Sequence, residues 1–196
     1  MNTPPSALPT ISLAGKRILD VGCYDGVTLA RPQFAQAAER HGVDVDADAV
    51  ARGTRAHPEF TLRVAGAESL PYPAERFDFV ISKVTLLYTN IPVALAEIFR
   101  VLRPGGEIFL TMHDFRHVWG WLVHTRSPKR IIDHGYIFLA SAIYIASGRI
   151  PRRPWKRTRE TFQSVGSLRR DLTKAGFVDI SFERTPKDFV IQARKP

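Results

Sequence analysis

The chain has 196 residues, of which 44% are hydrophobic and 24% are charged. This length and composition allow one substantial core, which favours a single α/β domain and excludes an intrinsically disordered chain. The formal net charge of +9 favours acidic partners, such as nucleic acid, anionic lipid or a phosphate-bearing substrate, although such an excess also serves solubility.

The only cysteine, Cys23, excludes an internal disulfide and a zinc site built on paired cysteines, so no metal centre is predicted. A lone cysteine favours a reducing, cytoplasmic location. The N-terminal residues contain no basic segment followed by an apolar run, so no secretory signal is expected. The uncharged apolar stretch 135–148 is shorter than the roughly 20 residues of a membrane-spanning helix. It is expected to pack against the domain or to dip into a membrane interface.

Apolar runs alternate along the chain with segments that repeat apolar residues at helical spacing. Pro92 is placed to start one helix and Gly176 to end another, whereas Pro32 must lie in the first turns of its helix or interrupt it. In chain order, the expected elements are a strand at 18–21, a helix at 27–40, a strand at 43–45, a helix at 47–56, strands at 60–64 and 77–82, a helix at 92–102, a strand at 107–112, a helix at 167–175, and strands at 177–182 and 189–193.

This alternation predicts an open parallel sheet with helices on both faces. Ligands of such sheets bind at the carboxyl ends of the strands, where the strand order reverses, so residues 20–26 are the first place to look for a site. Gly22 and Gly26 allow a tight turn and a close ligand approach there, and the amides of the expected following helix favour an anionic group. The turn can equally be structural alone, and its spacing matches neither the dinucleotide fingerprint nor a P-loop.

Asp44 lies at the end of the weak second strand, about 20 positions after the glycine turn. An acidic residue at this distance is placed to hold the ribose hydroxyls of a nucleoside. Asp46 and Asp48 compete with it for this role, and their alternative role is to cap the helix expected at 47–56.

The glycine turn, the acidic residue after the second strand and several further segments together indicate a family more specifically than each does alone. From Arg17 to Asp114 the chain resembles the class I S-adenosylmethionine-dependent methyltransferases, especially the group that includes ubiquinone- and menaquinone-type enzymes. The segments that carry the resemblance are Ile18-Leu19-Asp20-Val21-Gly22-Cys23-x-x-Gly26, Gly42-Val43-Asp44, Ala67-Glu68-Ser69-Leu70-Pro71-Tyr72-Pro73, Phe77-Asp78 and Val101-Leu102-Arg103-Pro104-Gly105-Gly106. A further match covers parts of 161–177 and looks like the family's last helix.

The resemblance implies a Rossmann-like, seven-stranded sheet whose last strand is antiparallel, with S-adenosylmethionine as the cofactor. It implies that the methionine portion of the cofactor is flanked by Asp20, Gly22 and Gly26. The ribose would be bound by Asp44, and the adenine would lie along Ala67 and Glu68. Lys83 would lie at the sulfonium or at the substrate mouth. The residues adjoining these positions, Cys23, Tyr24 and Val45, are expected to complete the cofactor site.

Two positions depart from the family pattern. Tyr24 occupies the place of a middle glycine, so its side chain must point away from the cofactor or close over it. Gly66 occupies the place of an acidic residue that often binds the adenine amino group. Glu68 or a backbone carbonyl must replace that acidic residue.

Methyl transfer depends mainly on alignment of the acceptor with the methyl group, and a base is needed only where the acceptor must lose a proton. His113 and Asp114, after the fifth strand, are candidates for that base, and Tyr88 is a candidate for the acceptor pocket. The alternatives are a hydrogen-bonded turn for His113 and Asp114 and a packed aromatic ring for Tyr88. The Asn-Pro-Pro-Tyr motif of amino and nucleobase methyltransferases is absent from the sequence.

Residues 115–160 interrupt the alternation and are expected to form a partly helical substrate lid within a single domain spanning 1–196. The segment is rich in aromatic residues, which indicates an apolar acceptor pocket. These residues are Trp119, Trp121, Tyr136, Phe138, Tyr144 and Trp155. The apolar helix can also simply cover the sheet.

The leading hypothesis is an enzyme that methylates a small organic acceptor, on oxygen and in secondary metabolism. The acceptor can be anionic or carrier-bound, because basic residues gather in 149–159. A second hypothesis is an RNA methyltransferase, which the shortness of that basic run disfavours. A third is a cofactor-free or membrane-surface binding protein on the same fold. The sequence leaves the acceptor and the oligomeric state open.

Overall fold

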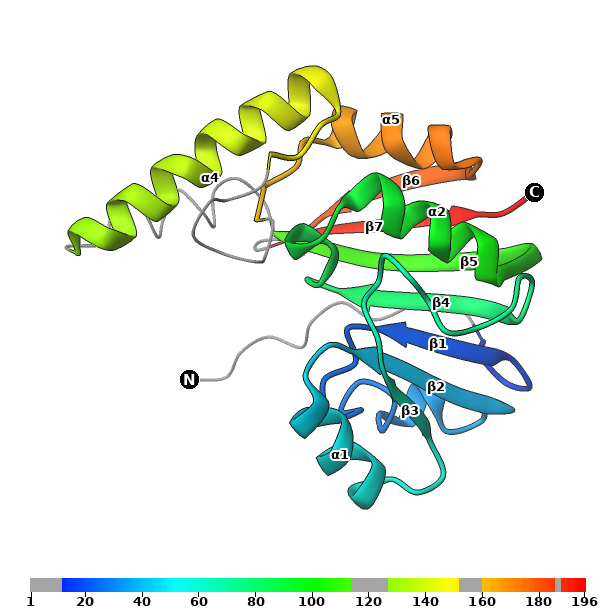
Figure 1. Ribbon diagram of the computed structural model, residues 1–196. Helices are drawn as coiled ribbons and strands as arrows, with labels where there is room; N and C mark the ends of the chain where they lie inside the picture. The colour runs from blue at the N-terminus through cyan, green and yellow to red at the C-terminus, as the bar shows by residue number, and fades with distance from the viewer. Residues whose placement is uncertain (1–11, 114–126, 152–159, 186–187) are drawn as a thin grey trace.

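A computed structural model describes residues 12–113, 127–151, 160–185 and 188–196 of the chain. The described residues form one seven-stranded sheet in the order β3-β2-β1-β4-β5-β7-β6 (Figure 1). The strands are β1 (Arg17–Val21), β2 (Glu39–Asp44), β3 (Thr61–Val64), β4 (Phe77–Lys83), β5 (Leu102–His113), β6 (Val178–Arg184) and β7 (Asp188–Arg194). The helices are α1 (Ala47–Ala56), α2 (Ile91–Val101), α4 (Pro128–Ser147) and α5 (Val165–Ala175), with short 3₁₀ turns η1 (Pro32–Phe34) and η2 (Leu86–Tyr88).

The direction of the strands confirms the expected sheet. β1 runs parallel to β2 and β4, β2 runs parallel to β3, and β4 runs parallel to β5. The last strand, β7, lies between β5 and β6 and is antiparallel to both. The chain builds β1, β2 and β3 toward one edge and then returns to place β4 on the other side of β1. The strand order therefore reverses between β1 and β4, and the glycine turn follows the carboxyl end of β1 at this point.

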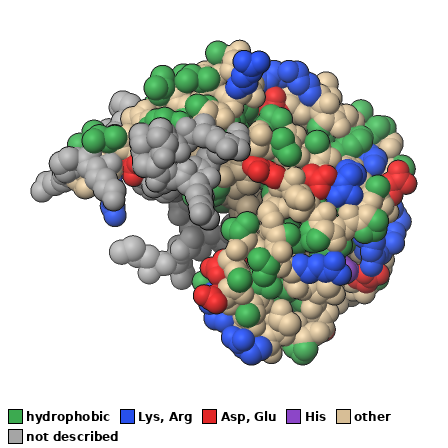
Figure 2. Space-filling view, viewed as in Figure 1, with side chains coloured by type: hydrophobic (Ala, Val, Ile, Leu, Met, Phe, Trp, Pro, Cys, Tyr) green, Lys and Arg blue, Asp and Glu red, His purple; other side chains and the backbone are tan. Residues whose placement is uncertain are grey.

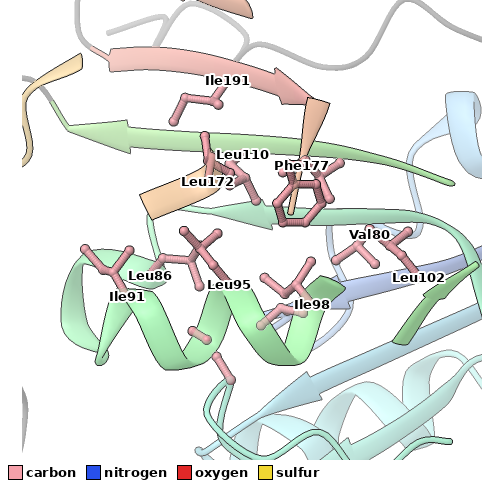
Figure 3. Close-up of a cluster of buried hydrophobic side chains, with 14 of the residues drawn as sticks. Val80, Leu86, Ile91, Leu95, Ile98, Leu102, Leu110, Leu172, Phe177 and Ile191 are labelled. Carbon is pink, nitrogen blue, oxygen red and sulfur yellow. The ribbon is translucent and has the colours of Figure 1, made fainter. Parts of the chain in front are cut away.

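Helices cover both faces of the sheet. On one face, Leu95 and Ile98 of α2 and Leu172 of α5 pack over Val80 and Leu110 in a buried apolar cluster (Figure 3). The opposite face carries a second cluster, since side chains alternate along a strand. Its strand residues are Ile18, Phe79, Ile81, Phe109 and Val190. On that face α1 comes so close that a Cβ on Gly53 would lie 2.6 Å from Leu62 of β3.

The helix predicted over 27–40 is wrong. This segment contains turns and η1, and β2 already begins at Glu39. Pro32 has no amide hydrogen to continue a helix, and the pairing of β2 with β1 leaves few residues for the connection. Leu29 and Phe34, both 0% exposed, cover the second face of the sheet in place of a helix.

The other helices agree well with the sequence prediction. α1 has the predicted bounds, and Asp46 caps it by accepting hydrogen bonds from the amides of Asp48 and Ala49. α5 ends at Gly176, whose φ of 101° is a left-handed conformation that favours glycine. The predicted stop at Arg103-Pro104-Gly105-Gly106 does end α2, but these residues belong to the long strand β5 rather than to a loop.

α4 lies within the predicted insertion 115–160, of which the structure describes residues 127–151 and 160. The helix ends at Gly148, which has a φ of 73°. It projects beyond the edge of the sheet, and its C-terminal end lies near α5 (Figure 1). None of the described helices combines the length and the apolar character needed to cross a membrane.

Candidate functional site

Asp20 is buried near the carboxyl end of β1, next to the point where the strand order reverses. Its side chain is 1% exposed, and neither carboxylate oxygen has a hydrogen-bond partner among the described residues. Burial raises the pKa of this carboxyl from 3.8 to about 7, and Asp44 adds to the increase while Lys83 opposes it. Asp20 pairs with Ile81, two residues before Lys83, so the two charged side chains lie on the same face of the sheet. A buried carboxylate without a hydrogen-bond partner among the described residues, at the edge of the sheet where ligands bind, is suited to bind a cationic group.

The glycine turn meets the end of β4 in very close contact. Gly22 has a φ of 85°, and a Cβ at this position would lie 1.9 Å from the hydroxyl oxygen of Thr85. Val84, directly before Thr85, has a φ of 61°, which is unusual for a β-branched residue and concentrates backbone strain at this point. The approach of Thr85 therefore requires a glycine at Gly22.

Tyr24 lies within the turn at a φ of 52°, a left-handed conformation that favours glycine. Its side chain is 50% exposed, and its hydroxyl accepts a hydrogen bond of 3.1 Å from Arg52 of α1. The guanidinium carbon of Arg52 lies 5.4 Å from the centre of the ring. The side chain thus reaches toward α1, at the rim of the turn.

Asp44, at the end of β2, is half-buried and faces the same turn. One carboxylate oxygen accepts a hydrogen bond of 2.8 Å from the amide of Tyr24, and the other accepts one of 3.0 Å from the amide of Asp46. Each oxygen has a further lone pair, so the carboxylate can still accept hydrogen bonds from the hydroxyl groups of a diol. Asp46 serves as a helix cap, which leaves Asp44 as the carboxylate best placed for a ligand.

Two of the predicted cofactor contacts, Cys23 and Gly26, lie against the protein interior. The side chain of Cys23 is 2% exposed and packs so closely on β2 that a Cβ on Gly42 would lie 2.6 Å from its sulfur. Burial raises the pKa of this thiol, and the nearby Asp20 and Asp44 raise it further. A Cβ on Gly26 would lie 3.3 Å from Phe60. Packing against the core is therefore one reason for the residue types at these two positions.

The anion site expected at a helix terminus after the turn is also absent from the described residues, because no helix follows. The amides of Gly22 and Cys23 both donate to the carbonyl of Val43, and the amide of Gly26 donates to the carbonyl of Cys23. These three amides are thus used within the turn and by β2.

The residues predicted to lie along the adenine surround the ends of β2 and β3. Val45 is 75% exposed, and Gly66 has open space in front of it, with Val45 the nearest side chain at 3.9 Å from a hypothetical Cβ. Ala67 is buried in the core. The carboxylate of Glu68 accepts a hydrogen bond from the amide of Asn90, where α2 begins.

The candidates for the acceptor side lie further along the carboxyl edge. His113 ends β5 and is half-buried, whereas Asp114 lies outside the described residues. Tyr88 of η2 is 39% exposed, and burial, followed by the charge of Glu160, raises its pKa. The amide of Thr161 donates a 3.2 Å hydrogen bond to the carbonyl of Leu87, so η2 meets the chain that follows the insertion.

α4 joins this region through aromatic and hydrogen-bonding contacts. The rings of Phe138 and Phe162 lie 5.3 Å apart between their centres, and the amide of Phe162 donates to the hydroxyl of Ser141. Tyr136 is half-buried on the same helix. Of the predicted aromatic lid residues, Trp119, Trp121 and Trp155 lie outside the described residues.

The sequence analysis missed the buried anchor of α4. Tyr144 is 0% exposed, and its hydroxyl donates to the carboxylate of Asp171 in α5. Arg170 forms a 2.9 Å ion pair with Asp171 and donates to the carbonyls of Tyr144 and Ile145. One signal was available: Asp171 adjoins Leu172 and follows Leu168 by three residues, so an acid lies on the apolar face of a helix and needs a buried partner.

Comparison with known proteins agrees with this arrangement. Residues 19–110 match the methyltransferase domain family. The S-adenosylmethionine-dependent methyltransferase of Mesorhizobium loti has the same fold, with a TM-score of 0.68 at 20% identity over 96% of this chain and 94% of that one. The middle of the chain therefore matches a methyltransferase domain family, and the chain has the fold of this S-adenosylmethionine-dependent methyltransferase.

Two curated relatives have recorded activities. The chain is 34% identical over 102 residues to the phthiotriol/phenolphthiotriol dimycocerosates methyltransferase of Mycobacterium leprae. It is 37% identical over 101 residues to the fatty-acid O-methyltransferase of Mycolicibacterium smegmatis. Each match covers 50% of this chain but only 38% and 37% of the respective relative, so the chain spans well under half of their length.

Proposed function

We propose that this chain binds S-adenosylmethionine at the end of β1 and transfers its methyl group to a small, largely apolar acceptor, on oxygen. The observation that carries the proposal is the buried Asp20 carboxylate, which has no hydrogen-bond partner among the described residues and lies where the strand order reverses. A buried polar group without a partner costs about 1–3 kcal/mol, and a ligand that supplies one recovers that energy. The cationic amino group of the cofactor has the required charge.

The other parts of the cofactor fit the same edge. Asp44 would accept hydrogen bonds from the ribose hydroxyls, and the exposed Val45 beside the open space at Gly66 would adjoin the adenine. Lys83 would lie near the reacting end, on the same face as Asp20. When bound, the cofactor supplies an electrophilic methyl group on a sulfonium.

The chain's own task is to align the acceptor and to exclude water. Alignment of two reactants can contribute about 7–11 kcal/mol to the lowering of a barrier. Tyr88, Phe138 and Phe162 provide aromatic surface on the acceptor side. His113 is the proposed base that removes a hydroxyl proton where the acceptor carries one, with Asp114 as its neighbour in sequence.

The acceptor class rests on two observations. The surface around α4 is aromatic and apolar, and two curated relatives are named for lipid substrates, a fatty acid and a phthiotriol dimycocerosate. We therefore propose a lipid-like acceptor, in free or carrier-bound form. The basic residues at 152–159, predicted to attract an anionic acceptor or RNA, lie outside the described residues.

A second candidate function is a binding protein that uses the fold without catalysis. It is favoured by two observations: the amides of Gly22, Cys23, Tyr24 and Gly26 already donate within the protein, and Tyr24 fills the place of a glycine. The two functions differ in whether the chain binds the product S-adenosylhomocysteine and turns over the cofactor.

Calorimetry with S-adenosylhomocysteine tests the cofactor site. Asp44→Ala should weaken binding by about tenfold or more, because the diol loses its acceptor. Asp48→Ala, an exposed acid in the first turn of α1, is the matched control and should bind like the wild type. Unchanged affinity in Asp44→Ala would remove this residue from the site, and no binding by the wild type would favour the non-catalytic function.

A turnover assay tests the acceptor side, with palmitate as the first probe and transfer of labelled methyl as the readout. Tyr136→Ala and Phe162→Ala should raise KM for palmitate or lower kcat while leaving S-adenosylhomocysteine affinity nearly intact. Val93→Ala, at an exposed position of α2, is the control. Normal turnover in both variants would show that α4 and its neighbours do not hold the acceptor.

A further inference from the structure

α4 exposes a large apolar face that the described part of the protein does not cover. Ile132 is 65% exposed, Leu139 is 59% exposed and Ile131 is 49% exposed, and Ile143 and Ile145 are more than a third exposed. Single exposed hydrophobic residues are common on protein surfaces, but a contiguous patch indicates an interaction site.

The exposed residues follow the helical repeat, so they form one continuous face. Ile132, Leu139 and Ile143 are separated by seven and four residues, which places them in one row along the helix. The small residues Gly135, Ala142 and Ala146 lie on the same face and are also exposed. All six residues are uncharged. The space-filling view shows hydrophobic side chains along this helix (Figure 2).

The opposite side of α4 is fixed to the protein. Ile137, Ala140, Ser141 and Tyr144 are all buried, and Tyr144 donates its hydrogen bond to Asp171 of α5. The helix therefore cannot rotate to bury its outer face without breaking this buried contact. An apolar face that the described residues hold outward and leave uncovered is suited to a partner surface.

Charge indicates what that partner is. Arg130 and Arg149 are exposed at the two ends of α4, and the outer face between them carries no acid. The sequence then continues with Arg152, Arg153, Lys156, Arg157 and Arg159, without an acid before Glu160. The chain as a whole has a net charge of +9. An apolar helix face flanked by cations complements the acyl and phosphate layers of an anionic lipid surface.

We propose that the outer face of α4 docks in the plane of an anionic lipid bilayer, with Ile132, Leu139 and Ile143 inserted among the lipid chains and Arg130 and Arg149 near the headgroup phosphates. This binding does not depend on methyl transfer and goes beyond it. The inner face of the same helix stays on the catalytic domain, so docking would hold the carboxyl edge of the sheet near the membrane.

Sedimentation with vesicles tests the proposal. The full chain should sediment with vesicles of phosphatidylcholine and phosphatidylglycerol, and less with phosphatidylcholine alone. Leu139→Gln combined with Ile143→Gln should lower the partition coefficient at least about tenfold, since two apolar side chains no longer insert. Arg130→Gln combined with Arg149→Gln should lower it by a similar factor and reduce its salt dependence.

Matched controls separate docking from misfolding. Val93→Gln removes an exposed apolar side chain from α2, and Arg55→Gln removes an exposed cation from α1, and both should sediment like the wild type. S-adenosylhomocysteine affinity should be unchanged in every variant, which verifies the fold. Absence of vesicle binding by the wild type would overturn the proposal. A dimer that the Leu139→Gln and Ile143→Gln variant converts to a monomer, without vesicle binding, would instead show that the face joins two copies.

Discussion

At the scale of single residues, the ionisation of Asp20 is the property most directly tied to ligand binding. Its pKa of about 7 means that the carboxyl is largely protonated at mildly acidic pH. A cationic amino group binds the ionised form, so S-adenosylhomocysteine affinity should fall as the pH decreases below 7, by up to about tenfold per pH unit. Calorimetry from pH 5.5 to 8, in steps of ~0.5 pH unit, measures this slope.

The variant Asp20→Asn checks the origin of the slope. It should bind more weakly than the wild type at pH 8 and show little pH dependence, whereas Asp48→Asn should retain the wild-type slope. The same slope in Asp20→Asn would assign the titration to another group.

The stability of the ligand-free protein should depend on Asp20 in the opposite sense to binding. The carboxyl binds a proton more tightly in the folded state, with a pKa of about 7 against an ordinary value of 3.8. Its stabilising contribution is therefore complete below pH 3.8 and is lost as the pH rises through 7, a loss of at most about 4 kcal/mol. Urea denaturation should find Asp20→Asn more stable than the wild type at pH 8, and a less stable variant would contradict the burial argument.

Tyr24 offers a second test at this scale. Its φ of 52° is costly for any residue with a Cβ, so Tyr24→Gly should be more stable than Tyr24→Ala by about 1 kcal/mol. Both variants lose the contact with Arg52 equally, which isolates the backbone effect. Equal denaturation midpoints for the two would show that this φ is not held in solution.

At the scale of elements, α4 depends on its buried anchor to α5. Tyr144→Phe removes the hydroxyl that donates to Asp171 and should reduce the free energy of unfolding by about 1–3 kcal/mol, with faster hydrogen exchange along α4. Tyr72→Phe is the matched control, because the Tyr72 hydroxyl is buried without a hydrogen-bond partner among the described residues. An equal loss of stability in both variants would mean that the Tyr144 hydroxyl has no special role.

The elements also show where sequence reasoning succeeded and failed. α1 and α5 have clear amphipathic patterns and end signals, and the structure has them where the sequence predicts them. The helix predicted at 27–40 is wrong because its alanine-rich composition favours a helix, while Pro32 and the early start of β2 prevent one. Its absence also removes the helix terminus that was expected to bind an anionic group.

At the scale of the whole molecule, cofactor binding should stabilise the entire domain. The proposed site joins β1, β2 and β4, which are neighbours in the sheet, so unfolding must release the ligand. At a concentration of about 100 times Kd, S-adenosylhomocysteine should add ~2.7 kcal/mol to the free energy of unfolding and raise Tm accordingly. Thermal denaturation of the wild type beside a variant with both Asp20→Asn and Asp44→Ala measures this. A shift of the same size in the double variant would place the ligand elsewhere.

The amino-acid sequence alone determined the order and type of most elements, and through them the sheet and its point of strand reversal. Apolar runs, helical periodicity and turn residues are local properties, so they can be recognised along the chain. The family segments, matched over 19–110, also directed attention to Asp20, Tyr24 and Asp44. The roles of His113, Asp114 and Tyr88, and the cytoplasmic location, stay predictions.

Only the tertiary structure decided which of these residues are buried and what each one contacts. Asp20 has its raised pKa because the packing around β1 excludes water, Gly22 must be glycine because Thr85 approaches it from β4, and Asp171 is satisfied by Tyr144 from α4. The exposure of the outer face of α4 is likewise set by the anchor on its inner face. Each of these properties depends on neighbours that are distant in sequence, and a local pattern carries no information about which distant residue will be adjacent.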